Sequence, residues 1–218
     1  LIGQVVFPLF SEIQDDETTL RKYFVKIVKF TAFIVFPIFT GMYLVAELAI
    51  VLLLSEKWIP MILPFKILCL IAALRAIDAF NSRLVYATGH PGIDLSNTAI
   101  CSLIMPLGFL IGSKYGLEGL SYAWLFLFPI VFLITTKRSI SIIDLSLLEY
   151  FRNLVPPIIA TFFMFLTVQS AKFLLSNYYN EIFQLVFYCS IGLFSYIGFI
   201  SIFFKPLLLE IRNFILLH

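Results

Sequence analysis

Four charged residues lie within one hydrophobic stretch of the sequence, and their side chains are the best placed to do chemistry. The stretch covers residues 59–88 and contains Lys66, Arg75, Asp78 and Arg83. A charged side chain at the centre of a bilayer costs roughly 2.5–3.5 kcal/mol on insertion scales, so such residues usually face a bundle interior or a water-filled cavity. The pattern therefore predicts a membrane-spanning helix that lines a polar route.

Two interpretations of this charged helix stay open. In the first, Arg75 and Asp78, three residues apart, pair on one face and only lower the cost of their own burial. In the second, Arg75 and Arg83 attract an anionic group inside a cavity. On the second interpretation the candidate substrate-binding residues are Arg75, Arg83, Asp78 and Lys66.

A further carboxylate, Glu47, lies toward the far end of the preceding hydrophobic span. It either reaches the headgroup region or couples the movement of an ion to transport. Asp78 is the second candidate for ion coupling.

The composition places the chain in a membrane. Hydrophobic residues make up 61% and charged residues 13% of the 218 residues, whereas soluble domains are about 45–50% apolar and about 25% charged. The apolar runs are continuous and long enough for helices, while a transmembrane barrel would need alternating segments of about ten residues. We therefore predict an all-α integral membrane protein with six transmembrane helices, and the net charge of +2 gives no indication of a nucleic-acid partner.

Hydropathy divides the chain into six parts. We expect the end of a truncated transmembrane helix (1–10), a cytoplasmic amphipathic helix (11–29), four transmembrane helices (30–136), a cytoplasmic loop (137–152), two last transmembrane helices (153–205) and a cytoplasmic tail (206–218). Ser11 and Gln14 have the spacing of a capping box at the start of the amphipathic helix. Pro156 and Pro157 are expected at the start of the fifth span, where proline is tolerated.

The basic residues predict the orientation. Eleven of the fifteen fall on the side of the membrane that holds residues 11–29, and the other four fall on the opposite side. Because positive charge accumulates on the cytoplasmic side, residues 11–29, 137–152 and the C-terminus are predicted to lie in the cytoplasm.

No recognisable catalytic motif occurs in the sequence. HExxH, CxxC, GxSxG and a phosphate-binding loop are all missing, so no enzyme activity, cofactor or metal site is expected. Cys69, Cys101 and Cys189 lie in apolar runs at unrelated spacings, which is typical of small apolar fillers. Gly108 and Gly112 form a GxxxG motif, extended by Gly116, that predicts close helix packing within one subunit.

Several short motifs follow one another in a recognisable order: VFPLFS (6–11), the acidic-then-basic helix at 15–29, Pro37 with Gly41, the turn at 55–58, ATGHP (87–91) and GLEGLSYA (116–123). In order and spacing they resemble the Wzx-type polysaccharide exporters of the multidrug/oligosaccharidyl-lipid/polysaccharide superfamily. The resemblance covers residues 5–136 best.

The resemblance implies a transporter of two six-helix lobes around a central cavity, of which this chain is the C-terminal portion. The implied activity is the flipping of undecaprenyl-pyrophosphate-linked oligosaccharide repeat units across the bacterial inner membrane by alternating access, for surface polysaccharide synthesis. Arg75 and Arg83 would then hold the pyrophosphate. Implied partners are the bilayer, the lipid-linked glycan, the missing N-terminal lobe, a polysaccharide polymerase and a chain-length regulator.

Two alternatives stay open, one in the same superfamily and one of another class. A drug or cation antiporter of the same superfamily would depend on one deep carboxylate, Glu47 or Asp78. A membrane-embedded glycan-modifying enzyme would need a cluster of polar residues at one interface, whereas the polar residues here are scattered along the chain.

Overall fold

Long helices build the whole of the described structure. The computed structural model describes residues 8, 10–14, 16–175 and 180–204, and no strand occurs among them. The predicted all-α fold is confirmed. The helices are α2 (Glu17–Leu54), α3 (Ile62–Ala87), α4 (Pro91–Gly112), α5 (Gly116–Ile140), α6 (Leu147–Leu175) and α7 (Glu181–Phe203), with the short 3₁₀ helices η1 (Glu56–Met61), η2 (Ser113–Tyr115) and η3 (Ser141–Ile143).

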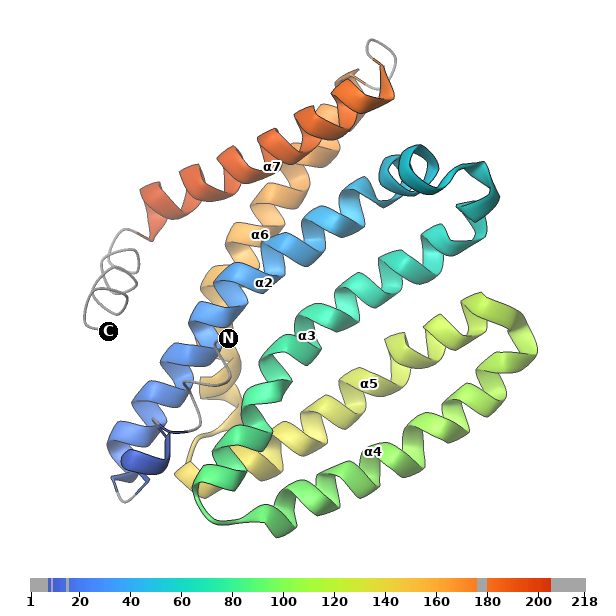
Figure 1. Ribbon diagram of the computed structural model, residues 1–218. Helices are drawn as coiled ribbons and strands as arrows, with labels where there is room; N and C mark the ends of the chain where they lie inside the picture. The colour runs from blue at the N-terminus through green and yellow to red at the C-terminus, as the bar shows by residue number, and fades with distance from the viewer. Residues whose placement is uncertain (1–7, 9, 15, 176–179, 205–218) are drawn as a thin grey trace.

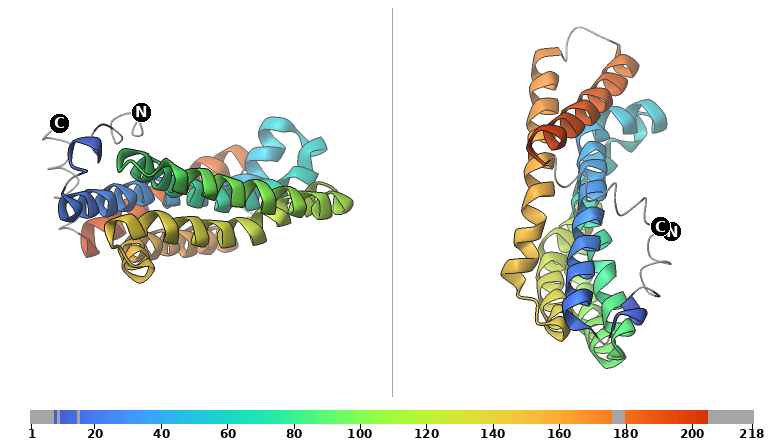
Figure 2. Two further views of the ribbon diagram at one scale, coloured as in Figure 1. Left: turned by 90° about the horizontal axis from the view of Figure 1, so that it is seen from below. Right: turned by 90° about the vertical axis from the view of Figure 1, so that its left-hand side faces the viewer.

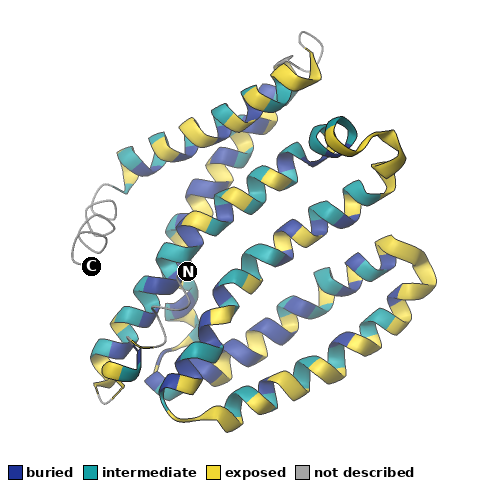
Figure 3. Cartoon of the chain, in the orientation of Figure 1, coloured by how far each residue is buried: buried dark blue, intermediate teal, exposed yellow. Residues whose placement is uncertain are grey.

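Five segments of the described chain are long and apolar enough to cross a membrane. One of them, Pro91–Ile143, contains both α4 and α5, which fold back on each other as a hairpin (Figure 1). Many large apolar residues are exposed, as expected where a protein meets lipid. Figure 3 shows that exposed residues recur along the length of the helices. The chain is a multi-pass membrane protein, and the count of six crossings stays a prediction.

The helices pack in a fixed spatial order. α2 packs against α3, α3 against α5, and α5 against α4, while α6 and α7 pack against each other and against α2 (Figures 1 and 2). Two clusters of buried apolar side chains result. One joins α2, α3, α5 and the start of α6, and the other joins α2, α6 and α7. Because α2 contributes to both clusters, it holds the four-helix part and the last helix pair together.

The predicted capping box at the start of α2 is wrong. The N-cap is Asp16, whose carboxylate accepts hydrogen bonds from the backbone N–H groups of Thr18 and Thr19, both at 3.1 Å, and from both hydroxyl groups. Ser11 and Gln14 lie upstream of this cap. The hydroxyls of Thr19 and then Thr18 contribute most to lowering the Asp16 pKa to about 2.

α2 then continues without a break from the predicted amphipathic segment into the first predicted span. Pro37 lies inside it and lacks the N–H that would bond to the carbonyl of Phe33 four residues earlier. The hydroxyl of Tyr196 on α7 donates to that carbonyl at 2.6 Å. A neighbouring helix thus satisfies the backbone group that proline leaves free, which is how membrane helices tolerate proline.

Three other predicted boundaries are corrected. The charged helix begins at Ile62, not at residue 59, because 59–61 belong to η1. The predicted loop 137–152 is mostly helical, since α5 extends to Ile140 and α6 starts at Leu147. Pro156 and Pro157 therefore lie inside α6. The helices continue into the polar segment, so polar sequence does not mark where they end.

The α4–α5 hairpin depends on two glycines. A Cβ at Gly112 would lie 2.5 Å from the backbone oxygen of Gly119, so only glycine allows this approach. Gly116 has a different role from the one predicted, because its φ of +70° places it in the turn, with no neighbour within 4 Å of a Cβ built on it. Gly108 meets Leu127 and Ala123 of α5 and supports the predicted close packing within the subunit.

Candidate functional site

Arg75 is an exposed cation beside an aromatic cluster. Its guanidinium carbon lies 5.1 Å from the centroid of the Trp124 ring on α5, and that ring packs 5.5 Å from Phe109 on α4. The contact orients the arginine toward the α5 side of α3 while its residue stays accessible. An arginine fixed in this way can still present its N–H groups to an anion.

The first of the two interpretations of the charged helix, a pair between Arg75 and Asp78, is not observed. No ion pair within 4 Å joins them in the described part of the chain, whose ion pairs involve other residues. Asp78 instead accepts a hydrogen bond of 2.9 Å from the side-chain amide of Asn81. The same amide donates to the hydroxyl of Thr136 on α5, also at 2.9 Å. The long side chain of Arg75 contacts the Trp124 ring on α5. The shorter side chain of Asp78 bonds to Asn81, which in turn bonds to Thr136 of α5.

Arg83 bonds within its own helix. Its guanidinium donates to the carbonyl of Ala79 at 3.0 Å, and its central carbon lies 5.1 Å from the Phe80 ring. Of the two arginines, Arg75 is thus the one that contacts a neighbouring helix.

Glu47 and Lys66, predicted for two separate roles, form one ion pair. The Lys66 amine lies 2.5 Å from the Glu47 carboxylate and 5.6 Å from the centroid of the Tyr43 ring. These contacts join the start of α3 to the C-terminal part of α2. Sequence reasoning missed a third charge at this site. Lys172 of α6 donates to the backbone carbonyl of Leu44, one turn before Glu47.

Sequence reasoning also missed a set of buried polar residues at the other end of the helices, on α3, α4, α5 and α6. Asn97 of α4 donates to the hydroxyl of Ser139 on α5 at 3.2 Å. The side-chain oxygens of Asn81 and Asn97 and the hydroxyl of Tyr150 are buried and have no protein partner. These amides were missed because only charged residues were considered. The available signal was an asparagine within an apolar run.

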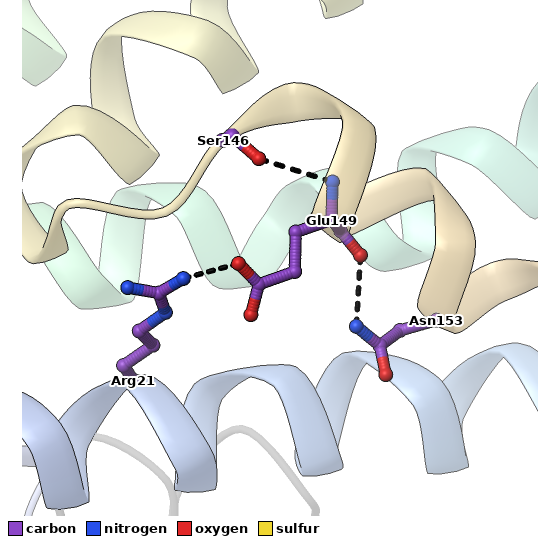
Figure 4. Close-up of polar contacts among 4 residues, drawn as sticks. All are labelled: Arg21, Ser146, Glu149 and Asn153. Carbon is purple, nitrogen blue, oxygen red and sulfur yellow. Dashed lines mark hydrogen bonds and ion pairs between the residues drawn. The ribbon is translucent and has the colours of Figure 1, made fainter.

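A salt bridge joins the starts of α2 and α6 at this end of the molecule (Figure 4). Arg21, near the start of α2, pairs with Glu149 in the first turn of α6. The Glu149 backbone N–H donates to the hydroxyl of Ser146 at 3.2 Å, and its carbonyl accepts from the amide of Asn153 at 2.8 Å. Because these bonds fix the start of α6, the carboxylate is held facing α2.

The described His, Cys, Asp and Glu side chains form no group of three that could hold a metal ion. The three cysteines are unpaired, with Cys69 buried, Cys101 half-buried and Cys189 exposed. What the described residues assemble is a set of separate polar contacts between helices. Arg75 is an accessible arginine that contacts an aromatic ring of another helix, and Arg138 of α5, also exposed, donates to the hydroxyl of Ser96 on α4.

A family model described as polysaccharide biosynthesis protein matches residues 1–63. The teichuronic acid biosynthesis protein TuaB of Bacillus subtilis is 24% identical over 163 residues, which are 74% of this chain and 34% of that protein. The lipopolysaccharide biosynthesis protein WzxC of Escherichia coli is 29% identical over 126 residues, 57% of this chain and 26% of WzxC. The predicted resemblance to polysaccharide exporters is confirmed.

The fold agrees with these sequence matches. The lipid II flippase MurJ, in an inward closed conformation, superimposes with a TM-score of 0.71 over 95% of this chain and 43% of its own, at 19% identity. The chain therefore has the helical arrangement found in part of that transporter. It spans about a third or less of the length of the curated relatives.

Proposed function

We propose that this chain is part of a flippase that moves undecaprenyl-pyrophosphate-linked oligosaccharide repeat units across the bacterial inner membrane by alternating access. The observation that carries the proposal is the match to WzxC along the sequence together with the MurJ-like fold over nearly the whole chain. The function is not enzymatic, since the chemistry required is the movement of an anionic headgroup and a glycan through a low-dielectric layer, which calls for cations and a cavity.

Within this proposal, Arg75 and Arg83 hold the pyrophosphate. Arg75 supports this role because the Trp124 ring orients it without neutralising its charge, and arginine binds phosphate oxygens through paired N–H groups. Lys66 fits the role less well. It is already paired with Glu47 and lies in the first turn of α3, far along the helix from Arg83. The anion site thus centres on the arginine half of α3.

Arg75→Ala tests the proposal in the full-length protein, in cells that lack the chromosomal copy of the gene. We expect surface polysaccharide to fall by about tenfold, because a charge-assisted hydrogen bond is worth about 1.5–3 kcal/mol. The amount of protein in the membrane should stay unchanged. Lys114→Ala, in the exposed η2 turn, is the matched control. Normal export by the Arg75→Ala variant would contradict the role of Arg75.

One observation supports the antiporter alternative. Asp78 is a half-buried carboxylate whose amide partner, Asn81, has a buried side-chain oxygen with no protein partner, so the site can accept an ion or a proton. Asp78→Asn keeps the shape and removes the charge. If Asp78→Asn abolishes export of a drug or cation while Arg75→Ala is silent, the antiporter assignment replaces the flippase assignment.

The remaining parts of the proposal concern location and partners. The C-terminus and the end of the molecule with Arg21 and Glu149 lie in the cytoplasm, and the end with Lys66 and Lys172 lies on the outer side. The other lobe of the transporter encloses the cavity with this chain. A polysaccharide polymerase and a chain-length regulator act on the exported repeat units.

A further inference from the structure

An apolar groove with a volume of about 480 Å³ lies between α2 and α7, with α6 beside both. Residues from Phe33 to Val45 of α2 form one wall. At 1.5 Å per residue this wall is about 18 Å long. Half of the hydrocarbon core of a bilayer is about 15 Å thick. The groove therefore has the depth of one leaflet, the distance that the acyl chain of a phospholipid covers.

Positive charge lies at one end of this groove. The Lys172 amine donates to the carbonyl of Leu44 and lies 5.8 Å from the centroid of the Tyr188 ring, and both of these residues line the groove. No carboxylate lies within 4 Å of that amine among the described residues. The carboxylate of Glu47, one helical turn after Leu44, is already paired with Lys66. These three side chains together carry one net positive charge.

We propose that this groove is a binding site for an anionic membrane phospholipid. Lys172 binds the phosphate, and one acyl chain lies along α2 toward Phe33. A basic site between membrane helices, joined to an apolar channel, is the chemistry that recognises an anionic lipid headgroup. The depth of the groove favours a phospholipid over a polyprenyl carrier, because a polyprenyl chain is far longer than one leaflet. The inference is independent of the export activity.

The site also has a structural consequence. α2, α6 and α7 all line the groove, so a bound lipid bridges the last helix pair and the four-helix part. On the predicted orientation the headgroup lies in the outer leaflet.

Two variants test the two halves of the site, each with a matched control. Lys172→Gln removes the charge at the headgroup, and Lys114→Gln removes an exposed lysine in the η2 turn. Gly41→Leu fills the groove, since Gly41 lines it and nothing lies within 4 Å of a Cβ built there. Gly198→Leu makes the same change on α7, also with nothing within 4 Å, at a position outside the residues that line the groove.

The full-length protein is equilibrated with vesicles of phosphatidylglycerol or phosphatidylcholine, repurified in mild detergent, and the retained lipid is measured by native mass spectrometry. We expect wild type to retain phosphatidylglycerol over phosphatidylcholine. Lys172→Gln should lower this preference by about tenfold, because one charge-assisted contact is worth about that much. Gly41→Leu should lower the retention of both lipids alike, because the leucine side chain occupies the space of the acyl chain. Both controls should behave as wild type.

Three outcomes would overturn the inference. The first is equal retention of the two phospholipids by wild type, and the second is unchanged retention in both site variants. The third is a polyprenyl phosphate as the lipid that copurifies from cells. None of the three bears on glycan export, which the Arg75→Ala experiment tests separately.

Discussion

Single residues in this protein act mainly by completing contacts between helices. Pro37 and Tyr196 show this at a distance of 159 positions in the sequence. The proline leaves the carbonyl of Phe33 without its helical partner, and the tyrosine hydroxyl replaces it at 2.6 Å. A buried carbonyl without a partner is costly in a membrane, so the proline and the tyrosine form one structural unit.

Tyr196→Phe should therefore destabilise the protein by about 1 kcal/mol, because the Phe33 carbonyl loses its donor. In a Pro37→Ala background the same change should cost less, since the alanine N–H can bond to that carbonyl within α2. Unfolding in mixed detergent micelles measures both values. Tyr122→Phe, at an exposed tyrosine of α5, is the control. Equal costs in the two backgrounds would show that Tyr196 does not substitute for the missing N–H.

The sequence predicted which segments form helices better than it predicted which side chains contact each other between helices. Apolar runs located the six long helices of the described structure. Spacing along one helix could not reveal that Arg75 contacts Trp124 or that Lys172 reaches α2, because such contacts depend on how helices pack. Helix ends were misplaced because the polar residues between apolar runs continue the helices instead of ending them.

At the scale of elements, the α4–α5 hairpin provides a direct test of close packing. Gly112→Ala should destabilise the protein by about 1–3 kcal/mol, because its Cβ would meet the backbone oxygen of Gly119, which cannot move as a side chain can. Gly92→Ala lies on the same helix with nothing within 4 Å and should be neutral or stabilising. Thermal unfolding in detergent compares them, and equal midpoints would refute tight packing at Gly112.

At the scale of the whole molecule, polar contacts concentrate near the two ends of the helices. One end has the Arg21–Glu149 pair and the Asn81–Thr136 and Asn97–Ser139 bonds. The other end has the Glu47–Lys66 pair and Lys172. The middle of the structure is held by apolar packing in the two buried clusters. This distribution suits a protein whose ends face water and headgroups while its middle faces lipid.

The orientation of these two ends is the last prediction. The excess of basic residues on one side predicts that the η2 turn lies on the outer side of the membrane and the η3 turn in the cytoplasm. In a full-length protein with the three cysteines of this chain replaced by alanine, a membrane-impermeant thiol reagent on intact cells should label Lys114→Cys. It should label Ser141→Cys only after the membrane is permeabilised. Both positions are exposed, so accessibility within the protein does not separate them. Labelling in the reverse order would place Lys66 and Lys172 on the cytoplasmic side and would invert the direction of transport that the proposed export requires.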